Sequence, residues 1–269
     1  MSDEQKEGLT FFGHLMELLS RFRTIAYALV ISTVAMMVIP ISLDFSSISA
    51  SNPWYQTISS FVIRKLQTDF LPADIELLPI SWFAPLEVYI YVSIMLGVTV
   101  SSPVIMYQIY KFVNPALHQR ERKLVYPFLI AFTGLFAFGF SLGYLVIIPA
   151  TVRAMVMFTE MLGLTPVYGF SDFFSVVMMT LLLSGFIFTF PIYVVLLVQA
   201  GVITTEQIKK SRKYLYVGAV VLIALIDPEP SLITEITCII PIIILMEASI
   251  LIARRFEKQR EQNEQNSDQ

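Results

Sequence analysis

The chain has 269 residues, of which 56% are hydrophobic and only 14% are charged, and its mean hydropathy is +0.70. Soluble globular domains carry about 25% charged residues, so this composition excludes an ordinary water-soluble domain and indicates a membrane protein. The net charge of −3 and the short, scattered basic runs exclude a nucleic-acid partner, and the single cysteine, Cys238, excludes an internal disulfide framework.

Six apolar segments are candidates for membrane-spanning helices. A helix needs roughly 20 residues to cross about 30 Å of hydrocarbon. The fifth segment has only 13 residues before DPEPS interrupts it, and we interpret it as a short span that requires local bilayer thinning or a partner helix. The spans are expected at about 22–43, 86–112, 124–148, 173–201, 214–226 and 232–253.

The Lys and Arg residues are divided unequally between the two sides that six spans define. If the amino terminus is cytoplasmic, only three of the 18 lie outside, namely Arg64, Lys65 and Arg153. Cytoplasmic loops of membrane proteins carry an excess of Lys and Arg. The sequence therefore predicts an all-α integral membrane protein with six transmembrane helices and both termini in the cytoplasm.

The segments outside the spans carry further predictions. The amino-terminal MSDEQKEG is acidic and polar, with no small-residue cleavage site after the first apolar run, so we expect the first span to be retained. We expect one domain over 1–260 and a polar tail at 261–269. Over the polar stretch EKQREQNEQNSDQ we expect the last helix to continue briefly and then to fray.

The outer loop, 44–83, is long enough to have structure of its own. Within it, PWYQTISSFVIRKLQ predicts an amphipathic helix lying over the outer face, with Pro53 in the first turn. The apolar residues at near-helical spacing are Trp54, Ile58, Phe61, Ile63 and Leu66.

No residue pattern indicates catalysis, a metal site or a cofactor. His14 and His118 both fall on the expected inner surface, and neither has the spacing of a metal site such as HExxH. Ser184 has no histidine in any span to activate it. We therefore expect a protein that is not an enzyme.

Acidic residues within the spans are functional candidates, because a charge at mid-bilayer costs about 3 kcal/mol. Glu247 is seven positions before Arg254 and hence on the same helix face, while Glu87 and Glu235 lie near the outer ends of their helices. Proton and ion carriers more often show a chain of such groups, and no internal repeat suggests inverted halves. A multi-pass small-molecule or ion transporter is the alternative interpretation.

Four prolines fall in or at the ends of the spans: Pro103, Pro149, Pro191 and Pro241. Each removes one backbone hydrogen bond and bends its helix. Kinked helices arranged as a cup are therefore predicted in preference to a tight bundle.

Three stretches resemble motifs of one family. The segment SSPVIMYQIYKFVNPALHQRERKLVYPFLI, 101–130, is similar to the most characteristic segment of TatC, the multi-spanning core of the twin-arginine protein translocase. GHLMELLSRFR resembles that family's HLxELRxRL, and GVITTEQIKKSRKYLYVGA resembles its inner loop before a short fifth helix. The resemblance covers the chain from Gly13 to about Ala253 and implies six spans with both termini inside.

The resemblance also implies a function. The family receives folded proteins whose signal peptides carry paired arginines, and exports them across the cell membrane by drawing on the protonmotive force. The implied partners are these signal peptides, single-span TatA/TatB-type subunits, other copies of the same chain and the lipid bilayer. No cofactor and no nucleic acid are implied.

The family's receptor surface is cytoplasmic and uses acidic residues that match Glu17 and Glu121 here. A guanidinium presents a rigid fork of donors that a carboxylate accepts two at a time, so two carboxylates could distinguish an arginine pair from a lysine pair. Other matching or supporting positions are His14, Phe112, Arg21, Arg120, Arg122, Lys123, Pro103 and Pro115.

Simpler roles for both glutamates are also open. Glu17 is four residues before Arg21, the spacing of a stabilising helical pair worth about 0.2–0.5 kcal/mol. Glu121 could neutralise its basic neighbours in a solvated loop. If Glu121 instead binds a signal arginine, Arg120, Arg122 and Lys123 would keep its carboxylate ionised and repel a poorly placed cation.

This sequence departs from the family pattern at several positions. Leu19 stands where the first motif has an arginine, and Thr189 in FTFP stands where many members have a glutamate. The usual outer-loop proline is replaced, at Phe61, and DPEP offers either Asp227 or Glu229 as the acidic site after the fifth span. These departures suggest a divergent or archaeal-type member, with an altered signal preference.

Overall fold

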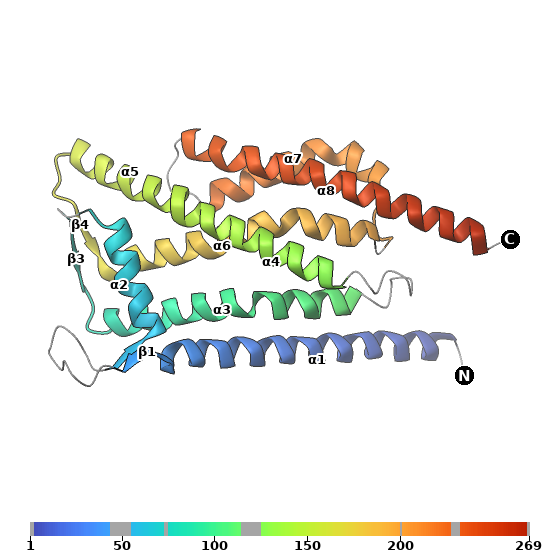
Figure 1. Cartoon of the computed structure of the whole chain (residues 1–269), viewed down its shortest axis with the longest axis horizontal. Coiled ribbons are helices and arrows are strands. Elements are labelled where there is room, and N and C mark those ends of the chain that lie inside the picture. The colour runs from blue at the N-terminus through green and yellow to red at the C-terminus, as the bar shows by residue number, and fades with distance from the viewer. Residues whose placement is uncertain are drawn as a thin grey trace.

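In the computed structural model, the described residues are 3–43, 55–72, 75–113, 125–199, 201–226 and 232–267. Long helices run roughly parallel to the longest axis, and four short strands gather at one end (Figure 1). The helices are α1 (Asp3–Val38), α2 (Ile58–Phe70), α3 (Ala84–Val113), α4 (Val125–Leu142), α5 (Ile148–Met161), α6 (Phe170–Gln199), α7 (Thr205–Ile226) and α8 (Leu232–Ser267). The strands are β1 (Pro40–Leu43), β2 (Tyr55–Thr57), β3 (Glu76–Leu78) and β4 (Val167–Gly169).

The two ends of the molecule differ in what they carry. Both termini lie at one end, which we call the termini end, and the four strands and α2 lie at the other, which we call the strand end (Figure 1). At the strand end β1 pairs antiparallel with β2, and β3 pairs in parallel with β4. The first and last described helices, α1 and α8, therefore have their outer termini at the same end of the molecule.

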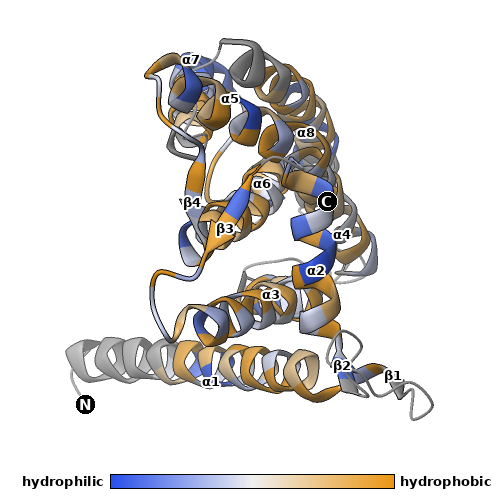
Figure 2. Cartoon of the chain, turned by 90° about the vertical axis from the view of Figure 1, so that its left-hand side faces the viewer, coloured by the Kyte–Doolittle hydropathy of each residue, from blue (hydrophilic) through white to orange (hydrophobic). Residues whose placement is uncertain are grey.

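Four helical segments are long and apolar enough to cross a membrane: Met16–Val38, Ala84–Phe112, Tyr126–Met161 and Phe170–Gln199. Large hydrophobic side chains, such as Phe22 and Ile31 of α1, are exposed on their surfaces, where Figure 2 shows hydrophobic residues along the helices. Exposed apolar surface of this extent marks contact with lipid or a partner. The predicted all-α membrane architecture is confirmed, while the count of six spans stays a prediction.

The first predicted span, 22–43, is wrong at its carboxyl end. The helix α1 ends at Val38, and Pro40–Leu43 forms β1. The residue before a proline disfavours helical backbone angles, so Pro40 ends the helix before the predicted boundary.

The third predicted span, 124–148, ends too early. A π-helical turn, Gly143–Ile147, joins α4 to α5, so the helical segment continues to Met161. Pro149 stands in the first turn of α5, directly after the π-helical turn. Proline has no backbone N–H to donate, and the wider π-helical turn directly before it lets the helix continue past this missing hydrogen bond.

The remaining boundaries lengthen two helices and shorten one. The helix α7 begins at Thr205, nine residues before the predicted fifth span, and ends at Ile226 as expected. The predicted frayed tail is instead helical, because α8 extends to Ser267. The outer helix starts at Ile58, not at Pro53, because Tyr55–Thr57 is a strand and the Thr57 side chain caps the helix by accepting from the Ser60 N–H at 3.2 Å.

The central helix of the molecule is α6, which packs on α3, α4 and α8. Its side chains Phe174, Leu181 and Phe188 are almost fully buried. Its internal proline, Pro191, is buried as well. Because α6 is covered by other helices along most of its length, it has the least surface left for lipid.

The first span is held by close approach to α3. Ser32 Oγ donates to the Gly97 carbonyl oxygen at 3.0 Å. A Cβ atom on Gly97 would lie 2.3 Å from Thr33 Oγ1 and 2.9 Å from the Thr33 backbone nitrogen. Small residues allow membrane helices to approach this closely, so α1 depends on a glycine at position 97.

Polar side chains tie α1, α2 and α3 together at the strand end. Ser59 and Ser93, both fully buried, share a hydrogen bond of 2.7 Å, and Ser59 Oγ donates to the Met36 carbonyl oxygen at 3.0 Å. Tyr89 Oη donates to the Met37 carbonyl oxygen at 2.5 Å. These bonds satisfy polar groups that would otherwise be buried without partners.

Candidate functional site

The termini end carries the described part of the predicted site. Glu17 and Arg21 lie one turn apart on α1, and Arg21 Nη2 donates to Glu17 Oε1 in an ion pair. The Arg21 side chain is 12% exposed and that of Glu17 34%. The structure therefore confirms the helical pair that the spacing predicts, and about one third of the Glu17 side-chain surface is exposed.

The Arg21 guanidinium is only partly satisfied. Its Nε and Nη1 atoms are buried and have no hydrogen-bond partner among the described residues. A buried charged donor without a partner costs free energy. Through its Nη2 contact, Arg21 is placed to orient the Glu17 carboxylate.

The end of α3 supplies apolar surface beside this face. Tyr110 is buried and its ring packs on Phe128 of α4, with centroids 5.5 Å apart. The next residues, Lys111 and Phe112, are exposed, and Phe112 presents 39% of its surface. Pro103, the other α3 residue of the predicted site, lies inside the helix three turns earlier and is half-buried.

Several predicted site residues lie outside the described residues. These are Pro115, Arg120, Glu121, Arg122 and Lys123, within the segment 114–124 that connects α3 to α4. His14 is placed in α1 by its backbone, three residues before Glu17, while its side chain lies outside the description. The structure therefore brings together Glu17 and Arg21 and leaves the pairing of Glu17 with Glu121 as a prediction.

The intramembrane acid Glu247 has partners that the sequence did not indicate. Its Oε2 lies 3.3 Å from Arg212 Nη2, and its Oε1 accepts from the Tyr216 hydroxyl, so both partners come from α7. Helical spacing could place Arg254 on the same face of α8, but only tertiary packing could bring α7 against it.

Glu87, the acid near the outer end of α3, also has a structural role. Its Oε1 accepts from Tyr91 Oη at 2.7 Å, and its Oε2 accepts from Ser171 Oγ of α6 at 3.0 Å. These bonds join α3 to α6 at the strand end. The side chain of Glu235, like Asp227 and Glu229, lies outside the described residues.

Thr189 stands in α6 where the resemblance implied a polar translocation residue in many members. It is buried, and its Oγ1 donates to the Phe186 carbonyl oxygen at 2.6 Å, within its own helix. The hydroxyl is thus satisfied by the backbone of the same turn.

A second polar site at the termini end escaped the sequence reasoning. The Thr205 N–H, at the first turn of α7, donates to both carboxylate oxygens of Glu257 at 3.2 and 3.3 Å. Glu257 lies on α8, 52 residues away. An acidic side chain at a helix amino terminus is stabilising, but a partner this distant leaves no local signal in the sequence.

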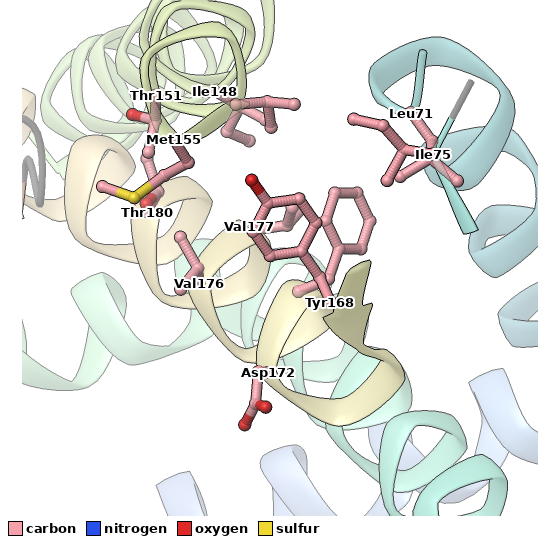
Figure 3. A pocket seen from close by; sticks show the side chains of 12 residues that line it. Leu71, Ile75, Ile148, Thr151, Met155, Tyr168, Asp172, Val176, Val177 and Thr180 are labelled. Atoms are coloured by element: carbon pink, nitrogen blue, oxygen red, sulfur yellow. The ribbon is translucent and has the colours of Figure 1, made fainter. Parts of the chain in front are cut away.

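The strand end contains an apolar pocket of about 180 Å³ between α2, α5 and α6. Figure 3 shows the Tyr168 hydroxyl directed into it, with Ile148 and Val177 along its walls and Asp172 pointing away. The Tyr168 hydroxyl is 2.8 Å from Thr159 Oγ1, so it is satisfied within the chain. The pocket offers packing space and no reactive group.

Among the described residues there is no group of three or more His, Cys, Asp or Glu side chains that could hold a metal ion. Cys238 is buried in α8.

Comparison with known proteins identifies a family. The model of the Sec-independent protein translocase protein (TatC) family matches residues 13–241. A TatC of Aquifex aeolicus is 31% identical over 243 residues, covering 89% of this chain and 95% of the relative. A TatC of Escherichia coli K12 is 30% identical over 206 residues, covering 76% of each chain.

Solved structures agree with this match. A crystal structure of the twin-arginine translocase receptor TatC in DDM superimposes with a TM-score of 0.70 at 29% identity, covering 89% of this chain and 99% of that one. A second crystal structure of the same receptor gives a TM-score of 0.69 at 29% identity, covering 90% and 99%.

Proposed function

The chain belongs to the TatC family of Sec-independent protein translocase proteins, and from this we propose that it is the receptor that binds twin-arginine signal peptides and forms the core of the export complex for folded proteins. The observation that carries the proposal is Glu17. Its partly exposed carboxylate lies at the termini end and accepts a hydrogen bond from Arg21 of the same helix.

The Glu17–Arg21 pair suggests how a signal arginine binds. An ionised carboxylate has about four lone-pair sites, and Arg21 Nη2 donates to the Oε1 atom of Glu17. A guanidinium of the signal peptide approaches the exposed side of the Glu17 carboxylate. It then either shares the carboxylate with Arg21 or displaces Arg21 from it. A lysine ammonium cannot reproduce the planar two-point contact, which favours an arginine pair.

Glu121 is the proposed second carboxylate. The segment that contains it begins where α3 ends, and α3 packs along α1. The adjacent Arg120, Arg122 and Lys123 keep Glu121 ionised and repel a poorly placed cation. His14 and Phe112 shape the site, and Pro115 shapes the connection.

Two carboxylates do not supply enough affinity by themselves. Good charge-assisted hydrogen bonds contribute about 1.5–3 kcal/mol each and exposed ion pairs about 0.2–1, whereas micromolar binding needs about 8. We therefore expect the apolar segment of the signal to pack along the spans, adding buried area while the carboxylates set the register. Photo-crosslinks from the apolar segment should reach the spans; crosslinks confined to the inner connections would contradict this.

The proposed setting is the cell membrane, with both termini in the cytoplasm. In support, both termini lie at one end, and Arg64, Lys65 and Arg153 lie on α2 and α5, toward the strand end (Figure 1). The proposed partners are single-span TatA/TatB-type subunits and other copies of the chain. The proposed role is transport without enzyme chemistry.

Retention of peptides by the purified protein tests the proposal. The wild type should retain a twin-arginine signal peptide and release its twin-lysine version. Glu17→Gln and Glu121→Gln should each weaken binding about tenfold or more, the effect of losing one charge-assisted hydrogen bond. Glu206→Gln is the matched control, because Glu206 is an exposed carboxylate in the first turn of α7 at the same end.

Unchanged retention in the Glu17→Gln, Glu121→Gln double variant would contradict the proposal. Equal retention of twin-arginine and twin-lysine peptides by the wild type would contradict the proposed basis of selectivity.

A further inference from the structure

A groove of about 480 Å³ lies where α4, α6 and α8 meet. Its volume falls within the roughly 300–1,000 Å³ of ligand sites. It extends from Leu135 of α4 and Leu245 of α8 toward the termini end, where Pro127, Gln199 and Ile252 line it. Its walls are apolar except for Gln199 and Ser249, and the Ser249 hydroxyl is satisfied by the Met246 carbonyl oxygen at 2.8 Å.

Small residues on two facing helices create the space. Ala131 and Gly134 line the groove from α4, and Ala248 lines it from α8. A Cβ atom on Gly134 would meet no atom within 4 Å, whereas one on Gly139, a turn further along the same helix, would lie 2.5 Å from the Ser184 carbonyl oxygen. Gly134 therefore leaves space in the groove, whereas Gly139 is a close-packing contact between α4 and α6.

Gln199 is the unexplained group in this groove. Its side chain is 97% buried, being only 3% exposed, and its amide nitrogen Nε2 has no hydrogen-bond partner among the described residues. A buried donor without a partner is rare in native proteins, since its desolvation is not compensated. The geometry thus calls for an acceptor supplied by something that occupies the groove.

The depth of Gln199 identifies that acceptor. Gln199 is the last residue of the candidate span Phe170–Gln199, so it lies at one end of the span, in the interfacial region of the bilayer. The ester carbonyl groups of a glycerophospholipid lie at this level, and its acyl chains extend from there toward the middle of the bilayer. The groove extends in the same direction, from Gln199 toward Leu135.

We propose that this groove is a binding site for a phospholipid, with an acyl chain along α4 and α8 and an ester carbonyl oxygen accepting a hydrogen bond from Gln199 Nε2. Arg255 is exposed one turn beyond Ile252 on α8, where it lines the polar cleft between α7 and α8 next to the groove's termini end. Its guanidinium suits the phosphate that every such lipid carries. The bound lipid fills space between three helices and completes their packing.

The experiment uses the purified full chain in detergent and phosphatidylglycerol of one chain length, in ester-linked and ether-linked forms. Native mass spectrometry measures the dissociation constant of the first retained lipid. The wild type should bind the ester-linked form about fivefold more tightly than the ether-linked form, the effect of one neutral hydrogen bond. Gln199→Leu should bind both forms equally, at the affinity of the wild type for the ether-linked form.

A second pair of variants tests the groove itself. Gly134→Leu should abolish tight retention, because its side chain fills the groove without a clash at Cβ. Gly218→Leu is the matched control: a Cβ on Gly218 of α7 also meets no atom within 4 Å, and this residue does not line the groove. Circular-dichroism melting verifies that each variant is folded.

Three results would overturn the proposal. They are equal affinity of the wild type for the two lipid forms, wild-type retention by Gly134→Leu, and a photo-crosslink from position 131 in cells to a protein helix and not to lipid. None of these measurements involves a signal peptide. The lipid-site proposal is therefore tested independently of the proposed receptor function.

Discussion

Glu247 shows how the surroundings of one residue decide between two functions. Its carboxylate pairs with Arg212 and accepts from Tyr216, both on α7. A carboxylate that is already paired across a helix interface is suited to holding the two helices together. An ion or solute carrier would instead need this group to exchange its partner during transport.

Replacement of Glu247 therefore separates the receptor from the transporter. We expect Glu247→Gln to lower stability by about 0.2–1 kcal/mol, the range of partly exposed ion pairs, and to leave retention of a twin-arginine peptide unchanged. Thermal unfolding in detergent measures the first effect and peptide retention the second. A loss of solute uptake in proteoliposomes, with peptide retention absent from the wild type, would favour the transporter.

Arg21 is a residue whose role depends on its planar group. Its Nη2 contacts Glu17, and its other buried nitrogen atoms lack partners among the described residues. We expect Arg21→Lys to preserve the fold and to weaken selectivity between twin-arginine and twin-lysine peptides, because an ammonium holds the carboxylate less rigidly. The ratio of the two peptide affinities measures this, and an unchanged ratio would assign Arg21 to stability alone.

Among the elements, α1 depends on its close contact with α3. Gly97→Ala places a Cβ atom against the backbone of Thr33, so the helices must separate. We expect a loss of about 1–3 kcal/mol, as for overpacked sites. Gly218→Ala is the control with open space around its Cβ, and equal melting temperatures for the two variants would contradict the close packing.

Asp69 links the outer helix α2 to the π-helical turn Gly143–Ile147, because its carboxylate accepts a hydrogen bond from the Tyr144 hydroxyl. It also accepts from Lys65 Nζ of its own helix at 3.0 Å. The Tyr144 hydrogen bond and then the Lys65 contact lower the pKa of Asp69 below its ordinary value of 3.8. The folded-state pKa is lower than the unfolded one, so the stabilisation is present above the unfolded pKa and is lost as pH falls through the folded pKa.

Hydrogen exchange of α2 measures this dependence. In the wild type, protection of α2 should decrease as the pH falls below about 4, the ordinary range of an aspartate. Asp69→Asn should show weaker protection at neutral pH and should lack the Asp69-dependent part of the change. An identical pH profile in both proteins would show that Asp69 does not attach the helix.

At the scale of the whole molecule, the orientation in the membrane is open to a direct test. In a Cys238→Ser background, Thr68→Cys on α2 and Ser211→Cys on α7 introduce exposed thiols at opposite ends. A membrane-impermeant thiol reagent added to intact cells should label position 68 and not position 211, because the basic residues near 211 favour the cytoplasm. Labelling of both positions would contradict the proposed topology.

The sequence by itself determined the membrane class, the family and the approximate positions of the long helices. These properties follow from composition, from apolar length and from motifs that are contiguous in the chain, such as 101–130. Local signals also set some boundaries, including the start of α8 at Leu232 and the end of α7 at Ile226.

Only the tertiary structure decided which distant groups meet. It paired Glu247 of α8 with Arg212 of α7, it capped α7 with Glu257, and it left Gln199 Nε2 beside an apolar groove without a hydrogen-bond partner among the described residues. It also continued α8 through a polar tail that was expected to fray. The physical reason is that hydropathy and helical periodicity describe one segment at a time, whereas ion pairs, caps and grooves depend on how neighbouring helices are placed in three dimensions.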